Sequence, residues 1–152
     1  MENYTSLIPF VTSVLLVSMT GAMFKPAEWY NSLRKPPWTP PNWLFAPVWT
    51  VLYIAIAVAG WLVWKKAGFG PALNVWTIQL LLNGSWSYVM FGAKNIGAAM
   101  LTLCALWLFV ALFAYMAWPI DRVGSMLFWP YLAWVTIAGT LNFSIWRLNR
   151  SA

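Results

Sequence analysis

The sequence predicts an all-α integral membrane protein: a bundle of five transmembrane helices that forms one domain over residues 1–152. Two observations lead to this prediction. The composition is 62% hydrophobic, 18% aromatic and only 8% charged, which is not the balance of a soluble domain. The charged residues also leave five uncharged windows, each long enough for the roughly 20 apolar residues that cross a bilayer. These windows are 3–24, 36–64, 67–93, 95–120 and 123–146.

The first window predicts a helix over residues 7–24, with Pro9 tolerated in its opening turn. A cleaved signal peptide is the alternative interpretation of an apolar stretch so near the start. Glu2 stands where a signal peptide carries basic residues, so a retained first span is favoured.

The connection between the first two spans, residues 25–43, has an unusual composition. Four tryptophans and five prolines fall between Trp29 and Trp49. Proline lacks a backbone donor and biases the preceding residue to extended conformations, so Lys35 to Asn42 is predicted not to be helical. Tryptophan needs apolar surface for its ring and a partner for its N–H. The connection is therefore either part of an interfacial aromatic belt or a lid over a pocket.

The other windows predict helices over residues 44–65, 72–91, 96–117 and 125–147. Pro47 comes early enough for an N-terminal turn, and Pro71 suits the first turn of the third span. The connections after the second span are short, which predicts that consecutive helices pack antiparallel.

The basic residues at the ends of the spans predict the orientation. Six lysines and arginines belong to the first loop, the third loop and the C-terminus, against three on the other side. The positive-inside rule then places the lid loop and the C-terminus in the cytoplasm and the N-terminus outside. The net charge of +6 is spread over these flanks, so the predicted partner is membrane lipid and no nucleic acid is expected.

The sequence also excludes several kinds of chemistry. It has no histidine and one cysteine, Cys104. Its three carboxylates all lie outside the predicted spans. A Ser-His-Asp triad, a disulfide within the chain and a metal-ligand cluster are therefore not expected. We predict no catalytic residue, no metal, no obligatory cofactor and no haem ligation through histidine.

Three predicted spans carry stripes that combine aromatic rings with amides or hydroxyls. Helical spacing places on one face each of the sets Asn83, Trp86 and Ser87; Trp134, Ala138 and Asn142; and Trp49 and Tyr53. Polar residues in spans commonly bond across helices, at about 0.6–2 kcal/mol per bond. An aromatic wall with a few convergent polar groups is also typical of a small-molecule site. The spacing alone leaves both interpretations open.

At these residues the sequence resembles the TspO family of tryptophan-rich sensory proteins, also called translocator proteins or peripheral-type benzodiazepine receptors. The matching segments are WYNSLRKPPWTPPNW at 29–43, APVWTVLY at 46–53, NGSWSYVMFGAKN at 83–95 and WPYLAWVTIAGTLNFSIWRLN at 129–149. The Lys–Pro–x–Trp–x–Pro–Pro motif from Lys35 to Pro41 is especially typical of that family.

The resemblance implies a homodimer of five-span subunits, with a pocket at the cytosolic end under the first loop. It implies binding of porphyrins such as protoporphyrin IX and haem, of sterols and of benzodiazepine-type ligands. The family's pocket positions fall on Trp38, Trp49, Tyr53, Asn83, Trp86, Trp134, Ala138 and Asn142. Most of them are the stripes defined by spacing, to which Ser87 also belongs, so a pocket is favoured over simple interhelical bonding.

Two details of the implied ligands depend on charged or hydroxyl groups. Arg34 and Lys35 in the lid loop are placed to meet the two propionates of a porphyrin; membrane topology alone is the other reason for their presence. The family's sterol segment follows a Leu/Val–Tyr–Arg/Lys pattern, which is weak by itself. Here it contains Leu141, Phe143 and Arg147, and the missing tyrosine hydroxyl puts sterol binding in doubt.

The resemblance thus suggests a receptor or sensor for porphyrins in a bacterial membrane. A porphyrin or sterol translocator is one alternative, although no inverted repeat or broken-helix pair typical of transporters is visible. Light-dependent porphyrin degradation is another, in which the protein would supply only redox-active indoles.

Overall fold

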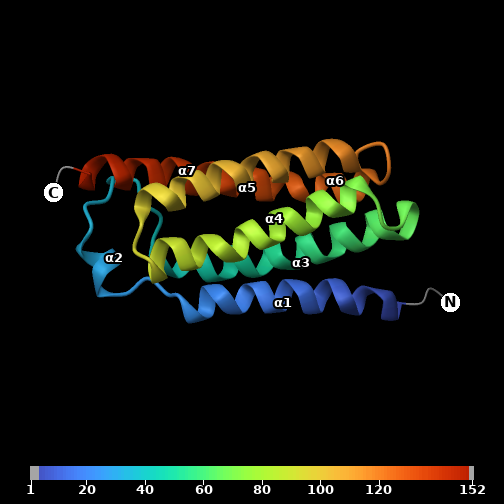
Figure 1. Cartoon of the computed structure of the whole chain (residues 1–152), viewed down its shortest axis with the longest axis horizontal. Coiled ribbons are helices and arrows are strands. Elements are labelled where there is room, and N and C mark those ends of the chain that lie inside the picture. The colour runs from blue at the N-terminus through green and yellow to red at the C-terminus, as the bar shows by residue number, and fades with distance from the viewer. Residues whose placement is uncertain (1–3, 151–152) are drawn as a thin grey trace.

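The structure, a computed structural model, describes residues 4–150, and its longest elements are five α-helices. They are α1 (Ile8–Met23), α3 (Asn42–Ala67), α4 (Pro71–Ser87), α5 (Ile96–Ala117) and α7 (Phe128–Asn149). Consecutive long helices run antiparallel in a bundle (Figure 1), as the short connections predict. No strand occurs in residues 4–150, so the all-α class is confirmed.

Three helical segments are long and apolar enough to cross a membrane. Their mean hydropathies are 1.7, 1.9 and 2.4, for Tyr4–Met23, Asn42–Ala67 and Ile96–Ala117 respectively. α4 has 17 residues, which is at the short limit for a span, and both α4 and α7 carry buried amides. Three of the five predicted spans are thus candidate membrane spans by length and composition; spans at α4 and α7 are part of the proposal below.

The lid loop contains the short helix α2 (Glu28–Ser32), which the sequence analysis missed. Residues 33–41 are non-helical, in agreement with the run of prolines. The prediction was wrong at Asn42, the first residue of α3. A proline restricts the residue before it, not the one after. Pro41, with φ −63° and ψ 144°, is the N-cap, and Asn42 is followed by Trp43, so Asn42 is free to begin the helix.

The predicted third and fifth helices also differ from their predicted bounds. A short helix, α6 (Arg122–Met126), precedes α7, which begins at Phe128 and not at residue 125. Pro130 has no N–H to bond the carbonyl four residues earlier, so the helix is interrupted in front of it. The α-helical part of α4 ends at Ser87, and a π-helical turn, η2 (Tyr88–Gly92), leads to Lys94 at φ 54° and then into α5.

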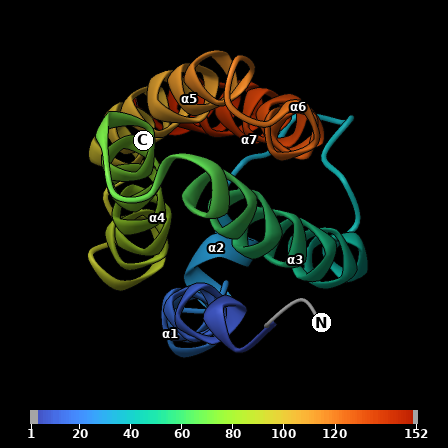
Figure 2. The ribbon, with the colours of Figure 1, turned by 90° about the vertical axis from the view of Figure 1, so that its right-hand side faces the viewer.

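The helices pack unevenly around the bundle axis (Figure 2). α5 lies closely along α4 and α7, and α1 lies against α3 and α4, whereas α3 makes few close backbone approaches to α4 or α7. One tight approach between α3 and α4 is at Gly60, where a Cβ would stand 2.5 Å from the ring of Trp76. Between α3 and α7, contact is made by aromatic side chains such as Phe45 and Trp134.

The core consists of two hydrophobic clusters. The larger runs along most of the bundle, and the smaller lies at the lid end and contains Tyr30, Met90, Ala99, Leu141 and Ile145. Phe45 of α3 and Trp86 of α4 pack against both clusters. The boundary between the clusters is therefore an aromatic zone between helices whose backbones are not closely packed.

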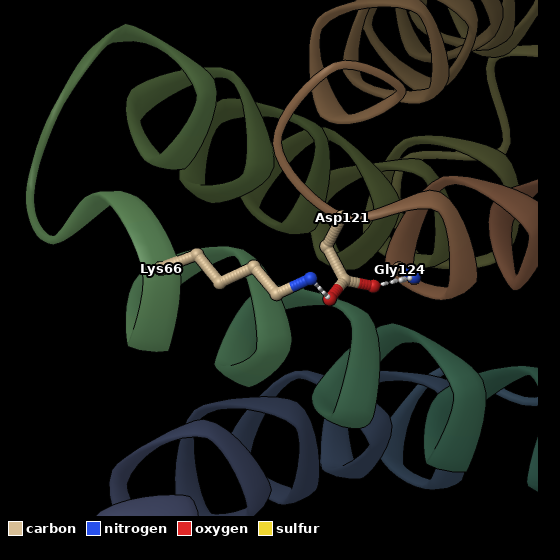
Figure 3. A network of polar contacts seen from close by, with 3 residues as sticks. All are labelled: Lys66, Asp121 and Gly124. Atoms are coloured by element: carbon tan, nitrogen blue, oxygen red, sulfur yellow. Dashed lines mark hydrogen bonds and ion pairs between the residues drawn. The ribbon is translucent and has the colours of Figure 1, made fainter.

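An ion pair joins α3 to α6 at the end of the bundle opposite the lid (Figure 3). Lys66 Nζ lies 2.7 Å from Asp121 Oδ2, and Asp121 Oδ1 accepts a 2.7 Å hydrogen bond from the backbone N–H of Gly124. Burial of Asp121 opposes its ionisation, but the hydrogen bonds from Lys66 and Gly124 outweigh burial and hold the pKa of its carboxyl below the usual 3.8.

We expect this pair to stabilise the bundle at neutral pH and to fail in acid. Because the pKa of Asp121 is lowered in the folded state, its contribution is present above the unfolded pKa of about 4 and is lost as pH falls through the folded value. In Asp121→Asn, which keeps a capping oxygen, this acid dependence should disappear. In Asp121→Ala the cap is lost as well, at a further cost of about 1 kcal/mol.

Thermal unfolding in detergent, followed from neutral to strongly acidic pH, measures both effects. The same acid-induced loss of stability in the parent and in Asp121→Asn would show that other groups cause it.

Candidate functional site

A chain of hydrogen bonds connects α3, α4 and α7 in the middle of the bundle. Tyr53 Oη donates to Asn83 Oδ1 at 3.1 Å, and Asn83 Nδ2 donates to Tyr131 Oη at 2.7 Å. Tyr131 Oη in turn donates to Gln79 Oε1 at 3.0 Å. Asn83, Tyr131 and Gln79 are buried. The predicted amide of Asn83 therefore bridges three helices across the loosely packed side of the bundle.

The aromatic wall predicted on α3 lies next to this chain. The ring of Trp49 stacks on Tyr53 with centroids 5.4 Å apart and meets the ring of Tyr131 edge-on at 6.2 Å. One turn nearer the lid, Phe45 meets Trp134 edge-on at 5.6 Å. Each predicted stripe thus meets the other helix through a residue that was not predicted, Tyr131 for Trp49 and Phe45 for Trp134.

The α7 stripe lies on the inner face of that helix. Trp134 and Asn142 are buried, and Ala138 between them is partly buried beside the larger cluster. Asn142 Nδ2 donates to the carbonyl of Ile96 at 3.0 Å, so half of this amide holds α7 to the start of α5. Ala138 is small where its neighbours one turn away on either side are large.

Three polar atoms of this zone are buried without a hydrogen-bond partner in the described part of the chain. They are Nε1 of Trp86, Nε1 of Trp134 and Oδ1 of Asn142; Nε2 of Gln79 is a fourth such atom. Buried polar groups are nearly always paired in folded proteins, so each exception requires an explanation. Two indole donors and one amide acceptor are therefore available to a ligand at the boundary between the two clusters.

The lid loop is fastened to the end of α7. The backbone N–H of Arg34 donates to Asn149 Oδ1 at 3.0 Å, and Asn149 Nδ2 donates back to the carbonyl of Arg34 at 2.9 Å. This pair of bonds holds the loop across the end of the bundle where the smaller cluster lies. No sequence pattern predicts this role of Asn149, because none connects positions so far apart in the chain.

The loop residues predicted to meet a ligand point elsewhere in this structure. The side chain of Trp38 is 49% exposed. Lys35 Nζ lies 4.6 Å from the centre of the Tyr30 ring and within 3.4 Å of the Asn31 and Leu33 carbonyl oxygens. The Arg34 side chain is exposed. The lid side chains therefore contact the loop itself or solvent.

Four further predicted residues lie apart from the central zone. Ser87 faces α1, where a Cβ on Gly21 would stand 3.7 Å from Ser87 Oγ. In the sterol segment, Leu141 is buried in the smaller cluster, whereas Phe143 is 42% exposed on the outer surface of α7. The guanidinium of Arg147 lies 5.9 Å above the Phe143 ring. Phe143 and Arg147 therefore share the outer face of α7, whereas Leu141 faces the core.

The structure adds Tyr131, Gln79 and Phe45 to the site. Spacing could have identified the first two, because Tyr131 lies three residues before Trp134 and Gln79 four before Asn83 on the same helix faces. Phe45 carries no polar group and had no signal beyond its place in the aromatic stretch.

This arrangement defines an integral membrane protein with an aromatic, amide-bridged zone inside a helical bundle, closed at one end by a proline-rich loop. The chain belongs to the TspO/MBR family, whose model matches residues 8–147.

Curated relatives support the assignment over nearly the whole chain. Protein CrtK of Rhodobacter capsulatus is 42% identical over 86% of this chain and 84% of its own length. A tryptophan-rich sensory protein of Cereibacter sphaeroides is 38% identical over 97% and 93%. The translocator protein of Bos taurus is 37% identical over 94% and 91%.

Proposed function

We propose that this protein is a membrane sensor that binds porphyrins in the aromatic zone between α3, α4 and α7. The observation that supports this most directly is the set of unpaired buried atoms on Trp86, Trp134 and Asn142. They lie among aromatic rings that meet edge-on, where a flat macrocycle of low polarity fits chemically. The names of two of the relatives above, a tryptophan-rich sensory protein and a translocator protein, agree with a sensing or translocating role.

The unpaired atoms match the polar groups of a free-base porphyrin. Such a ring carries pyrrole N–H donors, imine nitrogens and two carboxylates. The indole N–H groups of Trp86 and Trp134 can donate to a carboxylate or an imine nitrogen, and Asn142 Oδ1 can accept from a pyrrole N–H. In this proposal the ligand lies beneath the lid loop, which Asn149 holds to the end of α7.

The proposal includes spans at α4 and α7, which makes five in all. Polar side chains are tolerated in a spanning helix when they face the bundle and are bonded there. Gln79 and Asn83 of α4 and Asn142 of α7 are buried, and each makes at least one hydrogen bond inside the protein. These three amides are therefore hidden from lipid, whereas Asn74 is exposed in the first turn of α4.

Titration of protoporphyrin IX against intrinsic tryptophan fluorescence tests the binding proposal. We expect Trp49→Phe to weaken binding severalfold, since an aromatic contact contributes on the order of 1 kcal/mol, and Trp38→Phe to do the same if the lid closes on the ligand. Trp118→Phe, at a 46% exposed position at the opposite end of the bundle, is the matched control. Unchanged affinity in the double variant of Trp38 and Trp49 would contradict the lid-covered pocket.

The alternative activities have separate tests. A translocator moves labelled porphyrin across proteoliposomes, whereas a sensor only binds it. Light-dependent degradation bleaches the pigment in light and not in the dark, and Trp49→Phe should reduce that bleaching.

The lid loop and the C-terminus should both face the cytoplasm. The charge bias predicts it, and the bonds between Arg34 and Asn149 place the loop and the end of α7 at the same end of the bundle. Reporter fusions after Asn31 and after Ala152 should therefore both read cytoplasmic. Opposite readings would contradict the five-span arrangement.

A further inference from the structure

We infer that the outer seam between α5 and α7 binds an anionic phospholipid, with one acyl chain in an apolar groove and the headgroup in a cationic cavity at the lid end. This site lies on the outside of the bundle, separate from the zone proposed for porphyrin. Two cavities on the same seam support it.

The apolar groove has a volume of about 490 Å³. Met100, Cys104 and Trp107 of α5 line one side, and Gly139 and Phe143 of α7 line the other. The groove is open at Gly139, because a Cβ there would have no heavy atom within 4 Å. Its size falls within the usual range for a small-molecule site.

The few polar groups of the groove are already engaged. Thr136 Oγ1 donates to the carbonyl of Leu132 and accepts from Trp107 Nε1, both within 2.9 Å. Thr140 Oγ1 donates to carbonyls of its own helix. The groove therefore offers a hydrocarbon surface, which suits an acyl chain.

The second cavity, of about 300 Å³, lies on the same seam at the lid end. Lys94, Gly97, Trp146 and Arg150 are among its lining residues. Gly97 and Met100 are three residues apart, about 4.5 Å along α5, and the rings of Phe143 and Trp146 are 6.0 Å apart. The apolar groove and this cavity are thus neighbours, one helical turn apart.

Charge argues for an anionic headgroup in this cavity. The cavity is lined by the cations of Lys94 and Arg150 and by no carboxylate. The ion pair of Lys66 with Asp121 lies at the opposite end of the bundle. Asn95 and Asn149 also line the cavity, but their oxygens already accept backbone hydrogen bonds from Ala98 and Arg34. The ammonium and guanidinium groups are therefore the ones placed to meet a phosphate.

Native mass spectrometry of the full-length protein in detergent tests the proposal, with palmitoyl-oleoyl phosphatidylglycerol as probe and the phosphatidylcholine of the same chains as comparison. We expect phosphatidylglycerol to be retained preferentially. Each cation near an anionic lipid contributes about fivefold in affinity. In Lys94→Gln/Arg150→Gln, phosphatidylglycerol binding should therefore fall about 25-fold to the level of phosphatidylcholine. Lys25→Gln/Arg122→Gln, which removes equal charge elsewhere, should keep the preference.

A second variant tests the apolar groove. Gly139→Phe places a ring in open space, so the protein should melt like the parent and lose the lipid, with porphyrin binding unchanged. Ser85→Phe puts the same ring on the exposed face of α4 and should retain the lipid. The proposal would be overturned if the parent retained the two lipids equally, or if the preference survived loss of Lys94 and Arg150. Full lipid retention in Gly139→Phe would also overturn it, as would displacement of phosphatidylglycerol by cholesterol.

Discussion

Ala138→Phe should abolish porphyrin binding and leave the melting temperature close to that of the parent. Ala138 lies on the inner face of α7, between two buried residues whose polar atoms are unpaired, Nε1 of Trp134 and Oδ1 of Asn142. It is partly buried and not enclosed. A phenyl group there would occupy the space that a ring of the ligand needs, so binding should be lost and not merely weakened.

Thermal stability and protoporphyrin IX titration should be measured on the same preparation. Ala133→Phe is a matched control, because Ala133 is on the exposed surface of the same helix, and this variant should bind like the parent. If Ala138 is instead at a tight helix contact, the substitution overpacks it and costs roughly 1–3 kcal/mol. A collapsed melting temperature would then remove α7 from the proposed site.

Most of the fold could be predicted because the solvent determines it. In a bilayer a charged residue in a span is costly and about 20 apolar residues are needed, so the positions of twelve charges define the helices. The predicted bounds of 96–117 agree with α5 (Ile96–Ala117) because Asn95 caps that helix, its Oδ1 accepting from the N–H of Ala98 at 2.9 Å.

The bounds that were wrong depend on single backbone groups. Pro130 separates α6 from α7, and α2 forms in the part of the lid loop between Pro26 and Pro36, which contains no proline. Hydropathy averages over many residues and does not respond to one missing N–H.

The site was predictable along each helix and not between helices. Periodicity identified the faces that carry Trp49, Asn83 and Trp134, since residues three or four apart on a helix share a face. It could not show which face meets which, that Asn142 bonds to Ile96, or that Ser87 faces α1. The pair of hydrogen bonds between Asn149 and Arg34 joins positions 115 residues apart, and such a contact is set by tertiary packing.

Asn83→Leu should destabilise the bundle, because Asn83 donates to Tyr131 and accepts from Tyr53 across three helices. At about 0.6–2 kcal/mol per bond in a membrane protein, the loss of two bonds should cost about 1–4 kcal/mol. Leucine fills a similar volume, so little of this cost should come from a cavity. Asn74→Leu, on the exposed surface of the same helix, should be nearly neutral.

A double-mutant cycle with Tyr53→Phe separates the two roles that the sequence left open for Asn83. If Asn83 bonds the helices together, the two substitutions remove one shared hydrogen bond, so the double variant should be less destabilised than the sum of the single variants. Unfolding in detergent, read by helical circular dichroism, measures the difference.

Because both hydrogen-bonding groups of Asn83 are used within the protein, Asn83→Leu should lose stability first and porphyrin affinity only as a consequence. Parent-like stability with lost affinity would instead make Asn83 a direct ligand contact, which would require its bonds to Tyr53 and Tyr131 to break when the porphyrin binds.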